Sequence, residues 1–243
     1  MRPFELEGFL DSVLEPEKFD DYCHNGIQIE GDRDIKKLVT GVSFSHAFVE
    51  KALNSSADAI LVHHGIFGKT FFRLTGHLKR RVERVLLNGV TLLGYHLPLD
   101  ANIPYGNNYA IAQKLGLESL EKFDVGLIGR TPMETTVSEF THSLSQLFPN
   151  QKIFLHKNSE VVQKVCIISG GSSSMLDKLE GIADTFISGE VREPTRELSK
   201  EMGINYFCVG HYASERFGVM NLGKLVKERF SLDVEFIEYY NEL

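Results

Sequence analysis

The sequence lacks the features that mark a secreted or membrane-spanning protein. It has only three cysteines in 243 residues, Cys23, Cys166 and Cys208, and no two of them have Cys-x-x-Cys spacing. Cys166 and Cys208 lie within apolar runs, so we expect small buried thiols and a reducing, intracellular compartment. No apolar run is long enough for a membrane span, and residues 1–5 do not resemble a signal peptide. We therefore expect a cytoplasmic protein without membrane association.

The sequence also lacks a sustained block of basic residues. Its net charge is −7, and the longest basic cluster, residues 79–81, is typical of a solvated helix face. Electrostatics therefore indicate no nucleic-acid partner. The apolar fraction of 42% and the charged fraction of 24% are ordinary for a globular protein, and the length suffices for one large domain or two small ones.

What the sequence does contain is a repeated pattern of apolar strands and amphipathic helices. Three strand-like segments of the first half have counterparts in the second: 37–41 with 164–170, 57–64 with 183–190, and 89–96 with 203–211. Strands that alternate with helices are typical of parallel sheets. We therefore predict an α/β fold in which two similar halves, related by internal duplication, face each other around a metal-binding cleft. The expected domains are residues 1–124 (a half that the C-terminal segment could complete), a short middle insertion at 125–161, and a second half at 162–243.

Polar residues follow the predicted strands of the first half. The apolar segment 59–62 leads directly to His63 and His64, and the strand at 90–95 leads to His96, with Asp100 in the turn beyond. Adjacent residues on a strand point to opposite faces, but at a carboxyl end both imidazoles can reach the crevice where open α/β sheets bind ligands. The alternative is that the histidines are ordinary loop residues.

The second half offers a matching pair, His211 and Glu215. They are four residues apart at the predicted start of a helix, where a carboxylate suits the positive end of the helix dipole. A capping arrangement beside a surface histidine is the alternative interpretation.

These residue types agree in their chemistry. Histidines and carboxylates without cysteine suit a divalent ion such as Zn²⁺, Mn²⁺, Fe²⁺, Co²⁺ or Ni²⁺. One ion with an open position seldom needs five protein ligands, so the set favours two ions, with Glu215 as the bridging candidate and a metal-bound hydroxide as nucleophile. His96 is predicted to transfer a proton or contact substrate, although it could equally be a ligand.

Three segments, residues 21–31, 62–65 and 210–215, resemble the GTP cyclohydrolase type 2-like family, also described as dinuclear metal proteins like the NGG-interacting factor. The resemblance runs essentially end to end, although Leu97 and Pro98 replace an amide or threonine that the family often has before the aspartate. It implies two related α/β domains and a ring-shaped homohexamer, a trimer of dimers. It also implies two divalent metal ions per subunit, with ligands at His63, His64, Asp100, His211 and Glu215.

The expected function is that of a dinuclear metal-dependent hydrolase with His96 and Glu215 in catalytic roles. Its small-molecule reaction would be of the GTP cyclohydrolase type, or hydrolysis of a nucleotide or phosphoester. The alternative is a non-catalytic hexameric metal-binding scaffold or protein-interaction module, because the sequence offers no obvious second general acid. Residues 170–174, Gly-Gly-Ser-Ser-Ser, could cradle a phosphate or simply form a strand-to-helix turn with a serine cap.

Overall fold

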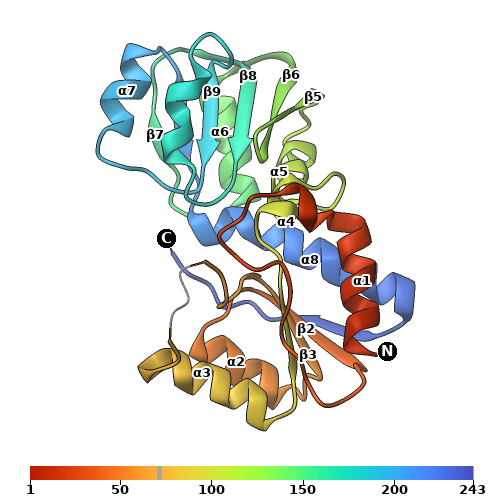
Figure 1. The fold of residues 1–243 in the computed structure, drawn as a ribbon. Coiled ribbons are helices and arrows are strands. Elements are labelled where there is room, and N and C mark those ends of the chain that lie inside the picture. Colours follow the sequence, from red (N-terminus) through yellow and green to blue (C-terminus); the bar gives the residue numbers. More distant parts are fainter. Residues whose placement is uncertain (70–72, 243) are drawn as a thin grey trace. The chain divides into compact units, whose positions relative to one another are not determined.

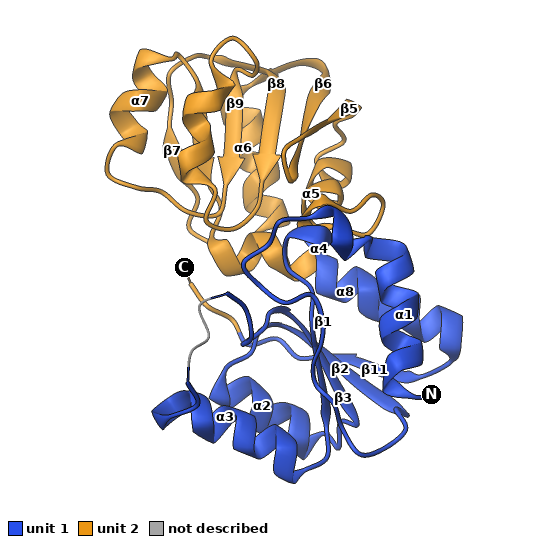
Figure 2. Cartoon of the chain, viewed as in Figure 1, with its two compact units in different colours: residues 1–99, 218–239 blue, residues 100–217, 240–243 orange. Residues whose placement is uncertain are grey.

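The computed structural model describes residues 1–69 and 73–242. The chain forms two compact units, shown in different colours in Figure 2. Unit 1 consists of residues 1–99 and 218–239, and unit 2 of residues 100–217 and 240–243. Residues 218–239 therefore return to complete the first unit.

Unit 1 is built on a five-stranded sheet with the order β1-β4-β3-β2-β11. Its strands are β1 (Gly26–Ile29), β2 (Lys37–Ser43), β3 (Ala59–His64), β4 (Thr91–Gly94) and β11 (Asp233–Phe236). All neighbouring pairs are parallel except β1 with β4. Because the crossovers are helical, both faces of the central strands are covered, and the first five residues of β3 are buried.

Helices cover both faces of this sheet. In Figure 1, α2 (His46–Asn54) and α3 (Gly76–Leu87) lie on one side, and α1 (Pro3–Leu14) and the later part of α8 (His211–Phe230) lie on the other. Neighbouring residues of β2 face these two helical layers in turn. A Cβ at Gly41 would lie 2.3 Å from the ring of Phe48 in α2, whereas Thr40 lies near Gly223 of α8 on the other face. Ser45 caps α2 by accepting a hydrogen bond from the Phe48 backbone N–H.

Unit 2 has a six-stranded sheet with the order β5-β6-β8-β9-β10-β7. Its strands are β5 (Glu118–Phe123), β6 (Gly126–Thr136), β7 (Phe154–His156), β8 (Val161–Ile168), β9 (Thr185–Ser188) and β10 (Asn205–Cys208). Strands β8, β9 and β10 are parallel, and the outer pairings are antiparallel. The helices that lie entirely within this unit are α5 (Asn107–Lys114), α6 (Val137–Leu147), α7 (Thr195–Glu201) and the 3₁₀ helix η2 (Ser173–Leu179), while α4 (Leu97–Ala101) spans the division at residues 99 and 100.

The core of unit 2 lies on both faces of its sheet. Val165 and Ile167 of β8 join the cluster that includes α5 and α6, while Cys166 and Ile168 join the cluster that includes η2. Cys166 is fully buried, which confirms the small-hydrophobe interpretation of this thiol.

The two sheets confirm the predicted α/β fold with two similar halves. Each contains three parallel strands in the same spatial order, β2-β3-β4 and β8-β9-β10. In each, the third of these strands pairs with an antiparallel strand that precedes it in sequence, β1 or β7. Residues 125–161 supply β6, α6 and β7, so they belong to the sheet of unit 2, and the compact units divide at residues 99 and 100.

Several elements differ from the sequence expectation. The predicted turn after His96 is the short helix α4, and the helix expected after residues 170–174 is the 3₁₀ helix η2, which begins at Ser173. The edge strands β5 and β11 were not predicted, because β5 buries none of its residues and β11 has only four. Among the described residues, no helix is long and apolar enough to cross a membrane.

Candidate metal centre

Three histidines meet at the carboxyl ends of two neighbouring strands of unit 1. His63 and His64 end β3, and His96 follows β4, which pairs with β3 in parallel register. Their ring centroids are 4.7 Å apart for His63 and His64, 5.0 Å for His63 and His96, and 5.8 Å for His64 and His96. One ring nitrogen of each lies within 4.8 Å of the others, so this histidine cluster could hold a metal ion.

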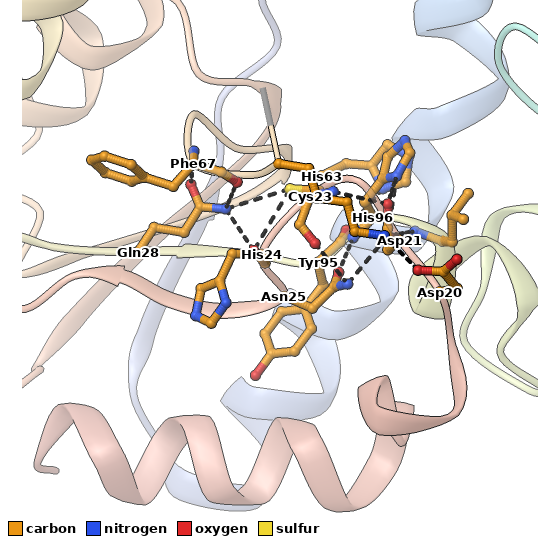
Figure 3. Close-up of polar contacts among 12 residues, drawn as sticks. Asp20, Asp21, Cys23, His24, Asn25, Gln28, His63, Phe67, Tyr95 and His96 are labelled. Atoms are coloured by element: carbon orange, nitrogen blue, oxygen red, sulfur yellow. Dashed lines mark hydrogen bonds and ion pairs between the residues drawn. The ribbon is translucent and has the colours of Figure 1, made fainter. Parts of the chain in front are cut away.

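The imidazoles of the adjacent pair are both held through Nδ1. His63 is fully buried, and its Nδ1 lies 2.9 Å from the Tyr95 backbone carbonyl oxygen, shown in Figure 3. A carbonyl only accepts, so Nδ1 of His63 carries the proton and Nε2 is the nitrogen that can bind a metal. Nδ1 of His64 lies 2.9 Å from the Ser43 hydroxyl at the end of β2.

His96 is held through Nδ1 by the carboxylate of Asp21. The two Nδ1–oxygen distances are 3.0 and 3.2 Å (Figure 3). Burial of Asp21 opposes ionisation, but hydrogen bonds from His96, from the Cys23 backbone N–H and from Asn25 outweigh it and hold the pKa of this carboxyl well below its usual range. The Leu97 backbone N–H donates to the same carboxylate. An ionised Asp21 therefore fixes the ring of His96 with Nδ1 as donor.

Gln28 of β1 fixes the chain immediately after the histidine pair. Its side-chain oxygen accepts from the backbone N–H groups of Ile66 and Phe67 at 2.7 and 3.2 Å, and its Nε2 donates to the His24 carbonyl at 2.6 Å. A Cβ at Gly65 would lie 2.3 Å from Gln28 Nε2, so only glycine leaves room for this bridge. Figure 3 shows Gln28 between His24 and Phe67.

In unit 2, His211 and Glu215 lie on consecutive turns of α8. Nε2 of His211 is 3.0 Å from Oε2 of Glu215, which is almost fully buried, and Nδ1 is 2.6 Å from Oε1 of Glu190. Burial disfavours the charged form of His211, but the carboxylates of Glu215 and Glu190 more than offset it and raise the pKa of His211 to about 9. Each nitrogen of the His211 ring thus has a carboxylate oxygen within 3.0 Å.

Gly170, two residues beyond β8, makes room for the carboxylate of Glu215. Its φ is +64°, and a Cβ there would lie 2.0 Å from Glu215 Oε1 and 3.3 Å from His211 Nε2. The Gly170 backbone N–H donates to the Ser214 hydroxyl at 3.0 Å. Because Gly170 has no side chain, this turn leaves room for the buried carboxylate of Glu215.

Asp100 is buried at the end of α4, and unit 2 orients its carboxylate with two hydrogen bonds. Asn107 Nδ2 and the Ser169 hydroxyl donate to Oδ1 at 2.9 and 2.7 Å. A carboxylate oxygen of Asp100 lies within 4.8 Å of one of Glu215. Asp100, His211 and Glu215 thus form a second cluster of metal-ligand types, which we call the carboxylate cluster.

All the predicted site residues therefore lie in these two clusters: His63, His64 and His96 in unit 1, and Asp100, His211 and Glu215 in unit 2. Sequence reasoning missed the residues that orient them. Asp21 and Gln28 fall within the segment that carried the family resemblance, but nothing in their spacing indicates their partners. Glu190 ends the strand-like segment 183–190, but the sequence does not indicate its partner. The orienting groups are Asp21, Gln28, Ser43, the Tyr95 carbonyl, Asn107, Ser169 and Glu190.

Comparison with known proteins identifies the family. The family model described as Duf34/NIF3 (NGG1p interacting factor 3) matches residues 1–242. The chain belongs to the Duf34/NIF3 family. A NIF3-family relative from Pasteurella multocida, named GTP cyclohydrolase 1 type 2 homolog, is 37% identical over 252 residues and 99% of each chain. The relative of the same name from Haemophilus influenzae is 35% identical over 99% of each chain.

Solved structures of NIF3-like proteins share the fold. The structure titled "Structural genomics, protein ybgI, unknown function" has a TM-score of 0.94 and 34% identity, and covers 100% of both chains. That of TTHA1606 from Thermus thermophilus also has a TM-score of 0.94, with 35% identity over 100% of both chains. The resemblance drawn from residues 21–31, 62–65 and 210–215 is thereby confirmed, and so is the fold class that it implied.

Proposed function

We propose that this NIF3-family protein is a hydrolase that binds two divalent metal ions through His63, His64, Asp100, His211 and Glu215. The observation that carries the proposal is the way its histidines are held. In both clusters a protein group engages Nδ1, which is how proteins orient histidines that bind metals through Nε2. Structural histidines need no such uniform arrangement.

The donor set supports borderline divalent ions. Imidazole nitrogens and carboxylate oxygens suit Zn²⁺, Mn²⁺, Fe²⁺, Co²⁺ and Ni²⁺. Five protein ligands exceed what one ion with an open coordination position needs, whereas two neighbouring ions can share them. Glu215 is the candidate bridge, because its carboxylate lies near both His211 and Asp100.

The ions would supply Lewis-acid polarisation of the substrate and a water molecule of lowered pKa. The role of His96 follows from its own contacts. Asp21 holds its Nδ1, which leaves Nε2 as the nitrogen that can accept or deliver a proton. We propose that His96 is the proton-transfer residue and that Tyr22, whose exposed ring packs edge-on against it at 4.8 Å, forms part of the same surface.

The names of the relatives suggest the first substrate to test. They are called GTP cyclohydrolase 1 type 2 homologs, so GTP ring opening and the hydrolysis of nucleotides and phosphoesters head the panel. We further propose a cytoplasmic homohexamer, built as a trimer of dimers. Sizing chromatography should then give about six times the chain mass of 27.4 kDa, and a monomer would contradict the assembly.

The deciding experiment combines metal analysis with a hydrolase panel that includes GTP. The purified chain should contain about two divalent ions, and Glu215→Gln should abolish turnover of any substrate found. Glu228→Gln, which changes an exposed carboxylate on the same helix, is the matched control and should leave both unchanged. Stoichiometric metal without turnover on any substrate would instead favour a metal-binding scaffold.

A further inference from the structure

We infer that Glu190 positions His211 for metal binding. The inference rests on the proposed function, since it assigns a role toward the same metal site. Glu190 is not a predicted ligand and acts only through the imidazole of His211. What singles it out is a 2.6 Å contact between its Oε1 and His211 Nδ1.

The sheet of unit 2 brings these residues together. Strands β9 and β10 are parallel neighbours, with Ser188 paired to Cys208 at their carboxyl ends. Glu190 follows the first strand by two residues and His211 follows the second by three. The ring of His211 thus lies between two carboxylates, with Glu190 at Nδ1 and Glu215 at Nε2, 3.0 Å away. Glu190 can orient the ring through Nδ1, while Glu215 and Nε2 of His211 can bind the same metal ion.

The backbone of Glu190 is itself anchored. The hydroxyl of the fully buried Tyr206 donates to its carbonyl oxygen at 2.5 Å, and its N–H lies 3.4 Å from the Ser188 hydroxyl. Gly171 lies beside the carboxylate, since a Cβ there would be 3.3 Å from Oε2. Glu190 is therefore held at its main chain, while its half-exposed side chain reaches the imidazole.

Unit 1 contains the same arrangement of a carboxylate next to Nδ1 of a histidine. There Asp21 engages Nδ1 of His96 at 3.0 Å, as Glu190 engages Nδ1 of His211. Carboxylates in this position fix the tautomer and the ring direction of metal-binding histidines and raise their basicity. Losing such a partner typically weakens metal affinity roughly 10- to 100-fold.

A competing role for Glu190 is substrate binding. It lines a hollow of about 360 Å³ together with Gln151, Phe154, Val191 and Cys208. A substrate-contacting carboxylate would change KM when removed and leave metal affinity intact. Removing a positioning carboxylate would instead weaken metal affinity, which can be measured without a known substrate.

The test measures Co²⁺ affinity by chelator competition and follows the visible spectrum of bound Co²⁺, which reports ligand geometry. Glu190→Ala should weaken the affinity of one bound ion about 10- to 100-fold and alter its spectrum. Glu190→Gln should fall between that variant and the wild type, because the amide oxygen still accepts from Nδ1. Glu193→Gln, an exposed carboxylate three residues later, is the control and should match the wild type.

The possible results separate the two proposals. Affinities and spectra unchanged in both Glu190 variants would overturn the inference and leave the proposed function standing. A wild-type chain that binds no Co²⁺ would overturn the proposed function and this inference with it. Thermal unfolding in chelator should give similar midpoints for wild type and Glu190→Gln, which separates loss of metal from loss of fold.

Discussion

Gly170→Ala provides a sharp test of how the carboxylate cluster is built. The new methyl group would lie 2.0 Å from Glu215 Oε1, whereas ordinary contacts begin near 3.4 Å, so the carboxylate must retreat by more than an ångström. Functional sites tolerate displacements of about 0.5 Å. At φ +64°, alanine also costs about 1–2 kcal/mol of backbone strain. The overlap should add about 1–3 kcal/mol, as overpacking of a filled interior does.

Gly203→Ala separates the two costs. Gly203 has φ +68°, close to that of Gly170, but a Cβ there meets nothing within 4 Å. This control should therefore be destabilised only by the backbone strain. At about 2–4 °C per kcal/mol, that strain corresponds to a fall of roughly 2–8 °C in Tm. Its metal affinity should be that of the wild type.

The assays are thermal unfolding in chelator and Co²⁺ competition on both variants. Gly170→Ala should unfold at a lower temperature than Gly203→Ala and bind Co²⁺ at least tenfold more weakly. Equal loss of stability in the two variants, together with wild-type metal affinity for Gly170→Ala, would refute the reasoning.

Three further predictions concern the other groups. His63→Ala and His64→Ala should each remove one metal ion and weaken the other, as measured by metal analysis; full retention of both ions would show that the pair does not serve two ions. Asp21→Asn should reduce the pH dependence of the free energy of unfolding. Because folding lowers the pKa of Asp21, its ionised form stabilises the wild type above the unfolded-state pKa of about 3.9, and this stabilisation is lost as the pH falls further. If the free energy of unfolding falls equally between pH 7 and pH 3 in the wild type and in Asp21→Asn, this prediction is contradicted. Finally, burial raises the pKa of the Cys166 thiol to about 12, so the native chain should react with a thiol reagent at pH 8 far more slowly than in denaturant, and equal rates would count against the buried core.

The strand-end histidines were accessible to sequence reasoning because the signal is local. The four apolar residues at 59–62 predict a buried strand, and parallel topology alone places His63 and His64 at its ligand-binding end. His211 and Glu215 were accessible for a similar reason, since their spacing predicts a pair at the start of a helix. Helix α8 begins at His211, so both residues occupy one face of the helix on successive turns.

The groups that orient the histidines were beyond sequence reasoning because their partners are distant in the chain. Asp21 is 75 residues from His96, and Glu190 is 21 residues from His211. Such pairs are set by strand order and register, which a single sequence specifies only through the whole fold. The edge strand β5 was missed for a different reason: it lacks the buried alternation that marks a strand.

The Nδ1 contacts have a consequence for the entropy of metal uptake. Protein groups, rather than an ion, restrict the rotamers of His63, His64, His96 and His211, so their ordering accompanies folding. Immobilising a side chain on binding otherwise costs about 0.5–1.5 kcal/mol. Metal association should therefore need little rearrangement of these rings, and most of its free energy should appear as added stability of the folded chain.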